Sequence, residues 1–348
     1  MEKLRCVFMG TPEFALGPLE ALAQAPFIEI ACAFTRPDAV SGRGKKLLPS
    51  PVAAWCEEHG IPVVKTKTVR TDEMKSALAQ AHADVFCVAA YGAILPADVI
   101  EMPRLGCFNV HASVLPQGRG AAPMQRALLT GDEPLGYSIM RIEEGLDSGP
   151  YCRQGSVEAG ERTYAEVSAE ISRLGGAALV DVMRDLACGI APAWVEQDDA
   201  AATHADKIDK SEVLLDPSVP AQVNMRRVQA SGDAAPARCN IDARGVRVCR
   251  AHVLDAEELG QLDEPLAAGE VVVWHKRLLL GCAQGVLEVV EVKPDGKRAM
   301  LGSEFAASVR GKRGNWEALL CLESPRPVWP LTARCASPAS ETPMSASS

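Results

Sequence analysis

The sequence predicts an α/β protein in which a mostly parallel, Rossmann-like sheet with helices on both faces precedes a small antiparallel, OB-like β-barrel. Three observations lead to this expectation. Apolar strand-like runs and helical runs alternate as far as residue 187, whereas short strands between turn residues follow from 207. The length of 348 residues also suits two domains. We expect a first domain at 1–188, a linker at 189–206, the barrel at 207–313 and a disordered tail at 314–348.

The first domain is expected to alternate strands with capped helices. Ser50 before Pro51 and Thr71 before an acidic pair mark two helix starts, and Thr163 with Glu166 forms a capping box for a long helix that ends near 187. A further helix is expected at 121–129. The expected strands are 4–9, 29–34, 61–64, 83–90, a strand from Cys107, and 137–142, followed in the barrel by 245–251, 269–274, 278–282 and 286–292.

The turn after the first strand bears on dinucleotide binding. It reads G-T-P-E-F-A from Gly10, with Thr11 as a candidate helix cap, and lacks the three glycines that let a pyrophosphate approach the backbone. A nicotinamide- or flavin-dependent oxidoreductase is therefore disfavoured.

Composition limits the class of partner and the compartment. The net charge of -9 argues against non-specific binding to nucleic acid, and an aromatic content of 5% argues against a base-stacking platform. The twelve cysteines contain no C-x-x-C pair, so we expect free thiols, several of them buried, in a reducing compartment. The N-terminus resembles no signal peptide, and no apolar run reaches membrane-spanning length, so the cytoplasm is expected.

The stretch 107–125, C-F-N-V-H-A-S-V-L-P-Q-G-R-G-A-A-P-M-Q, is the main candidate site. Strand side chains alternate, so Asn109, His111 and Ser113 should point one way while Phe108 and Val110 point the other. Asn109 and His111 then lie roughly 7 Å apart, close enough for both to reach one carbonyl group. An amide donor beside an imidazole can stabilise an oxyanion and move a proton.

Three further segments add to this candidate site. Asp147, between small residues, is a carboxylate that can orient an imidazole, although such an Asp often only stabilises a turn. Residues 91–96 form an apolar loop that can wall an aromatic ligand. The loop S-G-R-G-K-K-L-L-P-S-P at 41–51 concentrates cations in an acidic half of the chain, either as a solvated loop or as an arm that grips phosphates.

The motif N-V-H-A-S-V-L-P-x-x-R-G-A-A-P-M-Q followed by G-L-D-S-G closely resembles the folate-dependent formyltransferases. The loop G-R-G-K-K-L-x-P-S-P and the N-terminal M-G-T-P-E-F are similar to the members that formylate a charged tRNA. The resemblance extends over most of the chain, to the end of the expected barrel. The chain departs from the family pattern at Gln117-Gly118 and over 231–237.

The resemblance implies a reaction and a set of roles. The donor would be 10-formyltetrahydrofolate and the acceptor initiator methionyl-tRNA, with no metal and a monomeric enzyme. Asn109 and His111 would face the formyl group, and Asp147 would pair with His111. The folate site would comprise Tyr91, Gly92, Ile94, Leu95, Pro96, Ser113, Val114, Leu115, Pro116 and Glu143. The tRNA would be held by Arg43, Lys45, Lys46, Lys207 and Lys210.

Two alternatives stay open at this stage. The same chemistry can act on a small amine such as a sugar nucleotide or glycinamide ribonucleotide, but a small substrate needs neither the basic loop nor the barrel. A non-catalytic RNA-binding relative is the other alternative, and it has no use for Asn109, His111 and Asp147 together.

Overall fold

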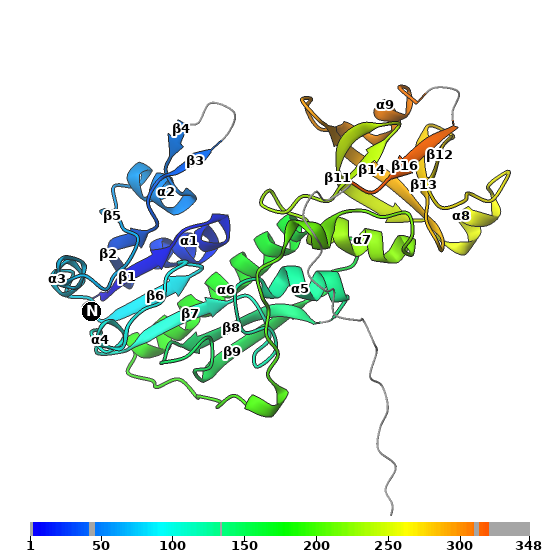
Figure 1. Cartoon of the computed structure of the whole chain (residues 1–348). Helices are drawn as coiled ribbons and strands as arrows, with labels where there is room; N and C mark the ends of the chain where they lie inside the picture. The colour runs from blue at the N-terminus through cyan, green and yellow to red at the C-terminus, as the bar shows by residue number, and fades with distance from the viewer. Residues whose placement is uncertain (1–2, 42–45, 133, 310–312, 320–348) are drawn as a thin grey trace, which may run out of the picture.

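The computed structural model describes residues 3–41, 46–132, 134–309 and 313–319, and it confirms the predicted fold class. One seven-stranded sheet occupies the first half of the chain, and a closed antiparallel barrel occupies the second (Figure 1). Among the described residues, no helix is long and apolar enough to cross a membrane.

The first sheet has the strand order β5-β2-β1-β6-β7-β8-β9. The pairs from β5 to β7 are parallel, whereas β8 and β9 join antiparallel at the β7 edge. The strands are β1 (Leu4–Gly10), β2 (Ile28–Thr35), β5 (Val63–Lys65), β6 (Val85–Ala89), β7 (Cys107–His111), β8 (Leu135–Arg141) and β9 (Tyr151–Val157), and a separate hairpin pairs β3 (Ala39–Ser41) with β4 (Lys46–Leu48).

Helix caps predicted from the sequence are confirmed. The Ser50 hydroxyl accepts from the amide of Ala53, and Thr163 forms the capping box with Glu166. Thr11 is an exception, because its hydroxyl donates to the carbonyl of Tyr91 and caps no helix. The helices are η1 (Glu13–Ala15), α1 (Leu16–Gln24), α2 (Pro51–Glu58), α3 (Asp72–Gln80), α4 (Ala97–Ile100), α5 (Pro123–Thr130) and α6 (Tyr164–Ala187).

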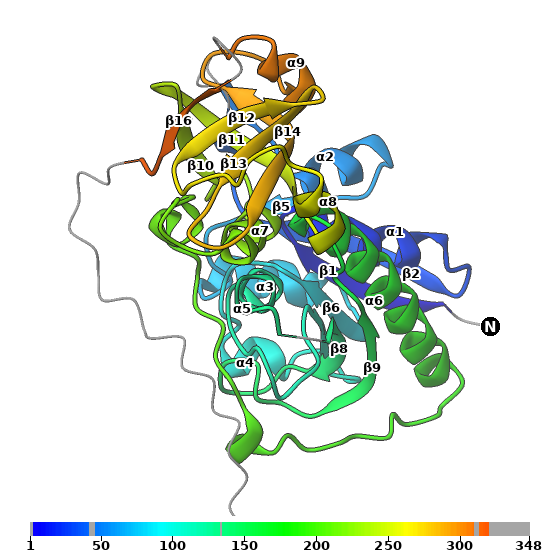
Figure 2. The same cartoon turned by 90° about the vertical axis from the view of Figure 1, so that its right-hand side faces the viewer.

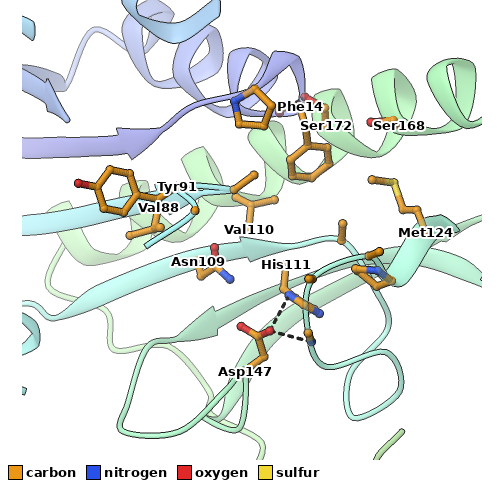
Figure 3. Close-up of a pocket in the computed structure, with 18 of the residues that line it drawn as sticks. Phe14, Val88, Tyr91, Asn109, Val110, His111, Met124, Asp147, Ser168 and Ser172 are labelled. Carbon is orange, nitrogen blue, oxygen red and sulfur yellow. Dashed lines mark hydrogen bonds and ion pairs between the residues drawn. The ribbon is translucent and has the colours of Figure 1, made fainter. Parts of the chain in front are cut away.

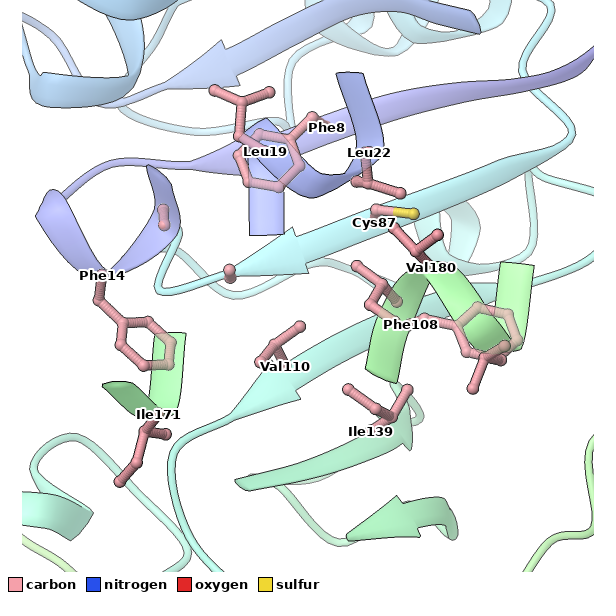
Figure 4. Packing of buried hydrophobic residues seen from close by; sticks show 14 of the residues in the cluster. Phe8, Phe14, Leu19, Leu22, Cys87, Phe108, Val110, Ile139, Ile171 and Val180 are labelled. Carbon is pink, nitrogen blue, oxygen red and sulfur yellow. The ribbon is translucent and has the colours of Figure 1, made fainter. Parts of the chain in front are cut away.

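Helices cover both faces of this sheet. Phe8 and Phe108 pack with α1 and α6 on one face (Figure 4), while Val7 and Phe86 pack with α3 and α4 on the other. Helices α1 and α6 approach so closely that a Cβ on Gly176 would lie 2.7 Å from the carbonyl oxygen of Gly17. The strands of the sheet therefore lie between two apolar layers, and polar side chains can be placed at the strand ends.

The second half forms a barrel in which β11 pairs with β14 to close a ring of strands β11-β10-β16-β12-β13-β14. Its strands are β10 (Arg238–Ile241), β11 (Arg244–Val253), β12 (Glu270–Trp274), β13 (Arg277–Gly281), β14 (Val286–Pro294), β15 (Met300–Leu301) and β16 (Arg313–Glu317). The turns and helices that accompany it are η2 (Asp199–Ala201), η3 (Lys210–Val213), α7 (Ala221–Ala230), α8 (Ala256–Gly260) and α9 (Gly302–Ala306).

The expected tail boundary is wrong for residues 314–317. Strand β16 is inserted between β10 and β12, and the side chain of Trp316 is only 2% exposed. The indole of Trp316 also donates to the carbonyl of Gly281 at 2.8 Å. No local pattern indicates this strand, because Gly314 and Asn315 disfavour a strand locally. Pairing on both sides and the buried Trp316 hold it in place.

Residues 189–206, expected to be a linker, run back across the sheet region (Figure 2). Val195 forms a bridge with Tyr151, and His204 forms one with Arg119. The segment therefore has contacts of its own with the first half of the chain. The cysteines expected in apolar strands, Cys6, Cys32, Cys87 and Cys107, are buried free thiols.

Candidate functional site

The end of strand β7 places two polar side chains opposite the core. Val110 packs among the buried residues under α6, so its neighbours Asn109 and His111 project from the other face (Figure 3). The imidazole of His111 is 6% exposed, and its Nε2 lies 2.9 Å from the carbonyl oxygen of Gly118. A carbonyl oxygen only accepts, so Nε2 carries the proton and donates.

Asp147 faces the other ring nitrogen of His111. Its Oδ2 lies 3.7 Å from Nδ1, which is too long for a direct hydrogen bond but close enough for strong electrostatic interaction (Figure 3). The same oxygen accepts from the amide of Gly120 at 2.9 Å. The structure therefore brings together the histidine and the carboxylate that the sequence singled out. The pair places an imidazole, which can donate or accept a proton, beside a carboxylate that can orient it.

Asp147 occupies an uncommon backbone conformation. It lies in the loop between β8 and β9 with φ of +51°, a left-handed value that Asp tolerates better than most residues. Gly120 has φ of +122°, and a Cβ there would lie 2.9 Å from the carbonyl oxygen of Ala205. The contact between these two loops therefore depends on one residue that tolerates positive φ and on one glycine.

A cleft of about 1780 Å³ runs over this site. Asn109, His111 and Asp147 line it, together with residues of α1, α5 and α6 and with Arg247 of the barrel. Six of the residues predicted for the folate site also line the cleft, namely Tyr91, Gly92, Ile94, Leu95, Pro96 and Glu143. Tyr91 and Leu95 are buried and anchor their loop, whereas Ile94 is 73% exposed beside the cleft.

Four predicted residues, Ser113 to Pro116, do not line this cleft. Strand β7 ends at His111, so the alternation of faces does not continue to Ser113. The Ser113 hydroxyl donates to the carbonyl of Gln117, and Leu115 is buried with its amide bound to Ser138. These residues instead build the loop that holds Gly118 against His111.

Of the predicted basic residues, Lys207 and Lys210 do not line the cleft. Arg43 and Lys45 lie outside the described residues, and Lys46 begins strand β4. Lys207 and Lys210 are exposed on the segment before the barrel. The cations that do line the cleft are Arg70, Arg173 and Arg247. They come from distant segments with no shared motif, so the sequence carried no signal that would group them.

Arg247 has a carboxylate partner within the cleft lining. Its guanidinium donates to Asp233 at 2.6 Å, and this hydrogen bond lowers the pKa of the Asp233 carboxyl below its ordinary value. Asp233 falls within 231–237, one of the places where the chain departs from the family pattern. Among the described residues, no group of three His, Cys, Asp or Glu side chains has the arrangement of a metal site.

Comparison with known families gives two consecutive matches. Residues 4–183 match the family described as formyl transferase, and residues 207–310 match the family described as formyl transferase, C-terminal domain.

Individual relatives agree with these matches. The chain is 39% identical over 313 residues to a methionyl-tRNA formyltransferase from Methylococcus capsulatus, covering 89% of this chain and 99% of that protein. It resembles the solved structure of HypX from Aquifex aeolicus in complex with tetrahydrofolic acid, with a TM-score of 0.58 and 12% identity, over 88% of this chain but only 48% of that one. It also resembles WlaRD, a sugar 3N-formyl transferase, with a TM-score of 0.58 and 13% identity, over 86% and 99% of the two chains.

Proposed function

The chain belongs to the formyl transferase family, and we propose that it transfers the formyl group of 10-formyltetrahydrofolate to the free amino group of initiator methionyl-tRNA. The product, N-formylmethionyl-tRNA, serves translation initiation, so the cytoplasm is the expected compartment. Residues 1–188 would form the catalytic domain, and the barrel from 207 to 317 would help to hold the tRNA.

The observation that carries this proposal is the His111–Asp147 pair, with Asn109 beside it, on the cleft that reaches the barrel. A typical site for one small ligand has a volume of about 300–1,000 Å³. A cleft of about 1780 Å³ therefore has room for a folate and for the end of a second substrate. The methionyl-tRNA formyltransferase relative matches this chain through the barrel as well, which favours a tRNA acceptor over a small amine.

Each residue has a chemical task in this proposal. As an amine adds to a formyl carbon, negative charge develops on the formyl oxygen. The Asn109 amide and the His111 ring would donate to that oxygen, and Asp147 would orient the ring. The bond between the formyl carbon and N10 of the donor then breaks. The attacking nitrogen gives up one proton and N10 takes one up, and His111 would carry out this transfer as base and then as acid.

The cleft lining fits a folate. Residues 91–96 supply an apolar wall with an anchored tyrosine, and Glu143 supplies a carboxylate that can accept from the donor-rich edge of a pterin. Bound in this way, 10-formyltetrahydrofolate would supply the formyl group, and tetrahydrofolate would be released.

The test is formyl transfer from 10-formyltetrahydrofolate to methionyl-tRNA by the full chain, with wild type and Asn109→Ala side by side. We expect transfer by wild type and a loss of about 10² to 10³ in kcat for the variant, because one oxyanion donor is removed. Binding of the tRNA without transfer would instead favour an RNA-binding protein. If the wild type neither bound nor formylated the tRNA, a small amine would be favoured as the acceptor.

The basic loop tests the identity of the acceptor. We propose that Arg43, Lys45 and Lys46 contact the tRNA together with Lys207 and Lys210. Replacing the first three with Ala should raise KM for methionyl-tRNA by at least about tenfold and leave KM for the folate nearly unchanged, because phosphate contacts serve only the tRNA. An equal effect on both KM values would contradict this role.

A further inference from the structure

Residues 195–205 connect the two family matches and belong to neither of them. We infer that this segment is part of the active-site framework and that Gln197 is a positioning residue for the His111–Asp147 pair. The inference rests on the proposed function for its kinetic consequence, but its structural part stands on the contacts of the segment alone.

Gln197 holds the turn that carries Asp147. Its Nε2 donates to the carbonyl oxygen of Asp147 at 2.8 Å and to that of Gly149 at 2.6 Å. These two bonds hold the turn at Asp147, the residue that has the left-handed φ. Because a left-handed Asp is uncommon, contacts from outside the turn are needed to keep its carboxylate in one place.

The same amide group contacts the opposite loop through Arg119. The Nε of Arg119 donates to Oε1 of Gln197 at 2.9 Å, and its Nη2 lies 2.8 Å from Asp199. The guanidinium is buried although Asp199 is 85% exposed, so Gln197 is its interior partner. A buried guanidinium costs free energy unless its donors are satisfied, which fixes the orientation of Gln197.

Backbone bonds complete the attachment. The amide of Arg119 donates to the carbonyl of Thr203, and the amide of Ala205 donates to the carbonyl of Arg119. The Thr203 hydroxyl accepts from the amide of Gly118 at 2.9 Å. Residues 203–205 therefore run beside the loop that contains Gly118.

These attachments reach both partners of the imidazole. The carbonyl of Gly118 accepts from His111, and the amide of Gly120 donates to Asp147, so both loops that orient the pair are tied to residues 195–205. A linker needs only enough length to join two domains, whereas this segment fixes two catalytic loops against each other. We expect its loss to disturb the geometry of the pair before it disturbs substrate binding.

The matched control is Gln229, a glutamine in α7 that is 6% exposed and makes the same kind of double contact. Its Nε2 donates to the carbonyls of Gly160 at 2.7 Å and Arg162 at 3.2 Å, away from the cleft lining. Gln197→Met and Gln229→Met both keep the side-chain length and remove both donors. Comparing the two variants shows whether a loss of kcat comes from losing any buried double contact or from losing the contact beside the His111–Asp147 pair.

The experiment measures kcat and both KM values for wild type and the two variants, with thermal unfolding as a check of folding. We expect Gln197→Met to lower kcat by about 10- to 100-fold, as a misplacement of about 1 Å does, with both KM values within about threefold. Gln229→Met should stay within about twofold of wild type in kcat. An unchanged kcat in Gln197→Met, or an equal loss in Gln229→Met, would overturn the inference.

A second readout needs no turnover. The imidazole ¹H–¹⁵N signals of His111 in the labelled full chain, identified by their loss in His111→Ala, should move in Gln197→Met and stay in place in Gln229→Met. Unmoved signals in Gln197→Met would overturn the inference. A wild type that fails to formylate methionyl-tRNA would overturn the proposed function instead, and the ring signals would still decide the role of Gln197.

Discussion

Two histidines of this protein face carboxylates, and they differ in what surrounds them. His252 of β11 contacts Glu161 at 2.7 Å and Glu258 at 3.0 Å, so both of its ring nitrogens have a carboxylate. His111 has one carboxylate at 3.7 Å and a backbone carbonyl on the other nitrogen. The shorter and more complete pairing lies outside the cleft lining, and the looser one lies on it.

The role proposed for His111 accounts for the difference. Glu161 belongs to the loop before α6, so the His252 cluster joins the barrel to the sheet region, and Arg250 with Glu166 makes a second ion pair beside it. Structural ion pairs gain from full mutual satisfaction. A histidine that moves a proton must keep part of its hydrogen-bonding capacity for the substrate. On the proposed mechanism, the looser pair is the catalytic one and the tighter pair is structural.

The largest expected effect on kcat comes from replacing His111 with Ala, and the same change at His252 is its control. His111→Ala should lower kcat by about 10² to 10⁴, because it removes the proposed proton donor, while folate affinity stays largely intact. His252→Ala should change kcat by no more than about twofold. Steady-state formyl transfer by both variants checks this expectation. Near-normal turnover of His111→Ala would remove that residue from the mechanism.

A smaller effect is expected from neutralising the carboxylates. Asp147→Asn keeps the size of the side chain and an oxygen for Gly120 but removes the charge beside His111. We expect kcat to fall by about 10- to 100-fold, because the charge beside His111 is lost while the imidazole itself, worth about 10² to 10⁴, remains. Glu161→Gln is the matched change at the other histidine and should leave kcat near the wild-type value. If both variants lost activity equally, the distinction between the two pairs would not hold.

The smallest effect is expected in stability and its pH dependence. Burial lowers the pKa of His252, but hydrogen bonds with Glu258 and Glu161 outweigh it and raise the pKa above its ordinary value. A raised pKa in the folded state contributes stability that is complete below the unfolded value of about 6.5 and is lost as pH rises through the folded pKa.

Wild type should therefore be more stable than His252→Ala by about 0.5–1 kcal/mol near pH 6, and the difference should shrink at alkaline pH. The expected difference is small because the carboxylate of Glu161 is largely exposed. Thermal unfolding of both proteins across this pH range measures the difference. A gap that does not change with pH would assign the His252 contacts to packing rather than to charge.

The stability contributed by Glu258 depends on pH in the opposite direction, and it is lost in acid. A hydrogen bond from Arg277, with further bonds from the Asp255 backbone and His252, lowers the pKa of Glu258 to about 2. A lowered pKa contributes stability above the unfolded value of about 4.3, and that stability is lost as pH falls through the folded value. Glu258→Gln should therefore lose stability at neutral pH and approach wild type in strong acid.

Local signals allowed much of the fold to be predicted from the sequence. The caps at Ser50 and Thr163 depend on residues three apart, and the alternation along β7 depends on neighbours, so each was visible in a short window. The same reasoning failed at Ser113, because it extended the strand past His111, where the chain turns away. Local pattern predicts a strand better than it predicts where the strand ends.

The remaining features depend on contacts between distant residues. Gln197 bonds residues about fifty positions earlier, and no pattern around it differs from that of an ordinary polar linker. Arg70, Arg173 and Arg247 meet only because the fold brings three elements to one cleft. A single sequence shows long-range pairing least. The proposed catalytic residues were therefore visible through their motif, while the contacts that support them were not.

The place of β16 in the barrel also has a consequence for biosynthesis. Every strand of the first sheet is complete by Val157, whereas the barrel ring stays open until residues 313–317 enter between β10 and β12. Domains fold from the N-terminal end as the chain emerges from the ribosome. The sheet region can therefore reach its native pairing while the barrel still waits for its last strand. Translation that stops before Trp316 would leave a protein with a complete first sheet and an unclosed barrel, whose two unpaired strand edges would be open to aggregation.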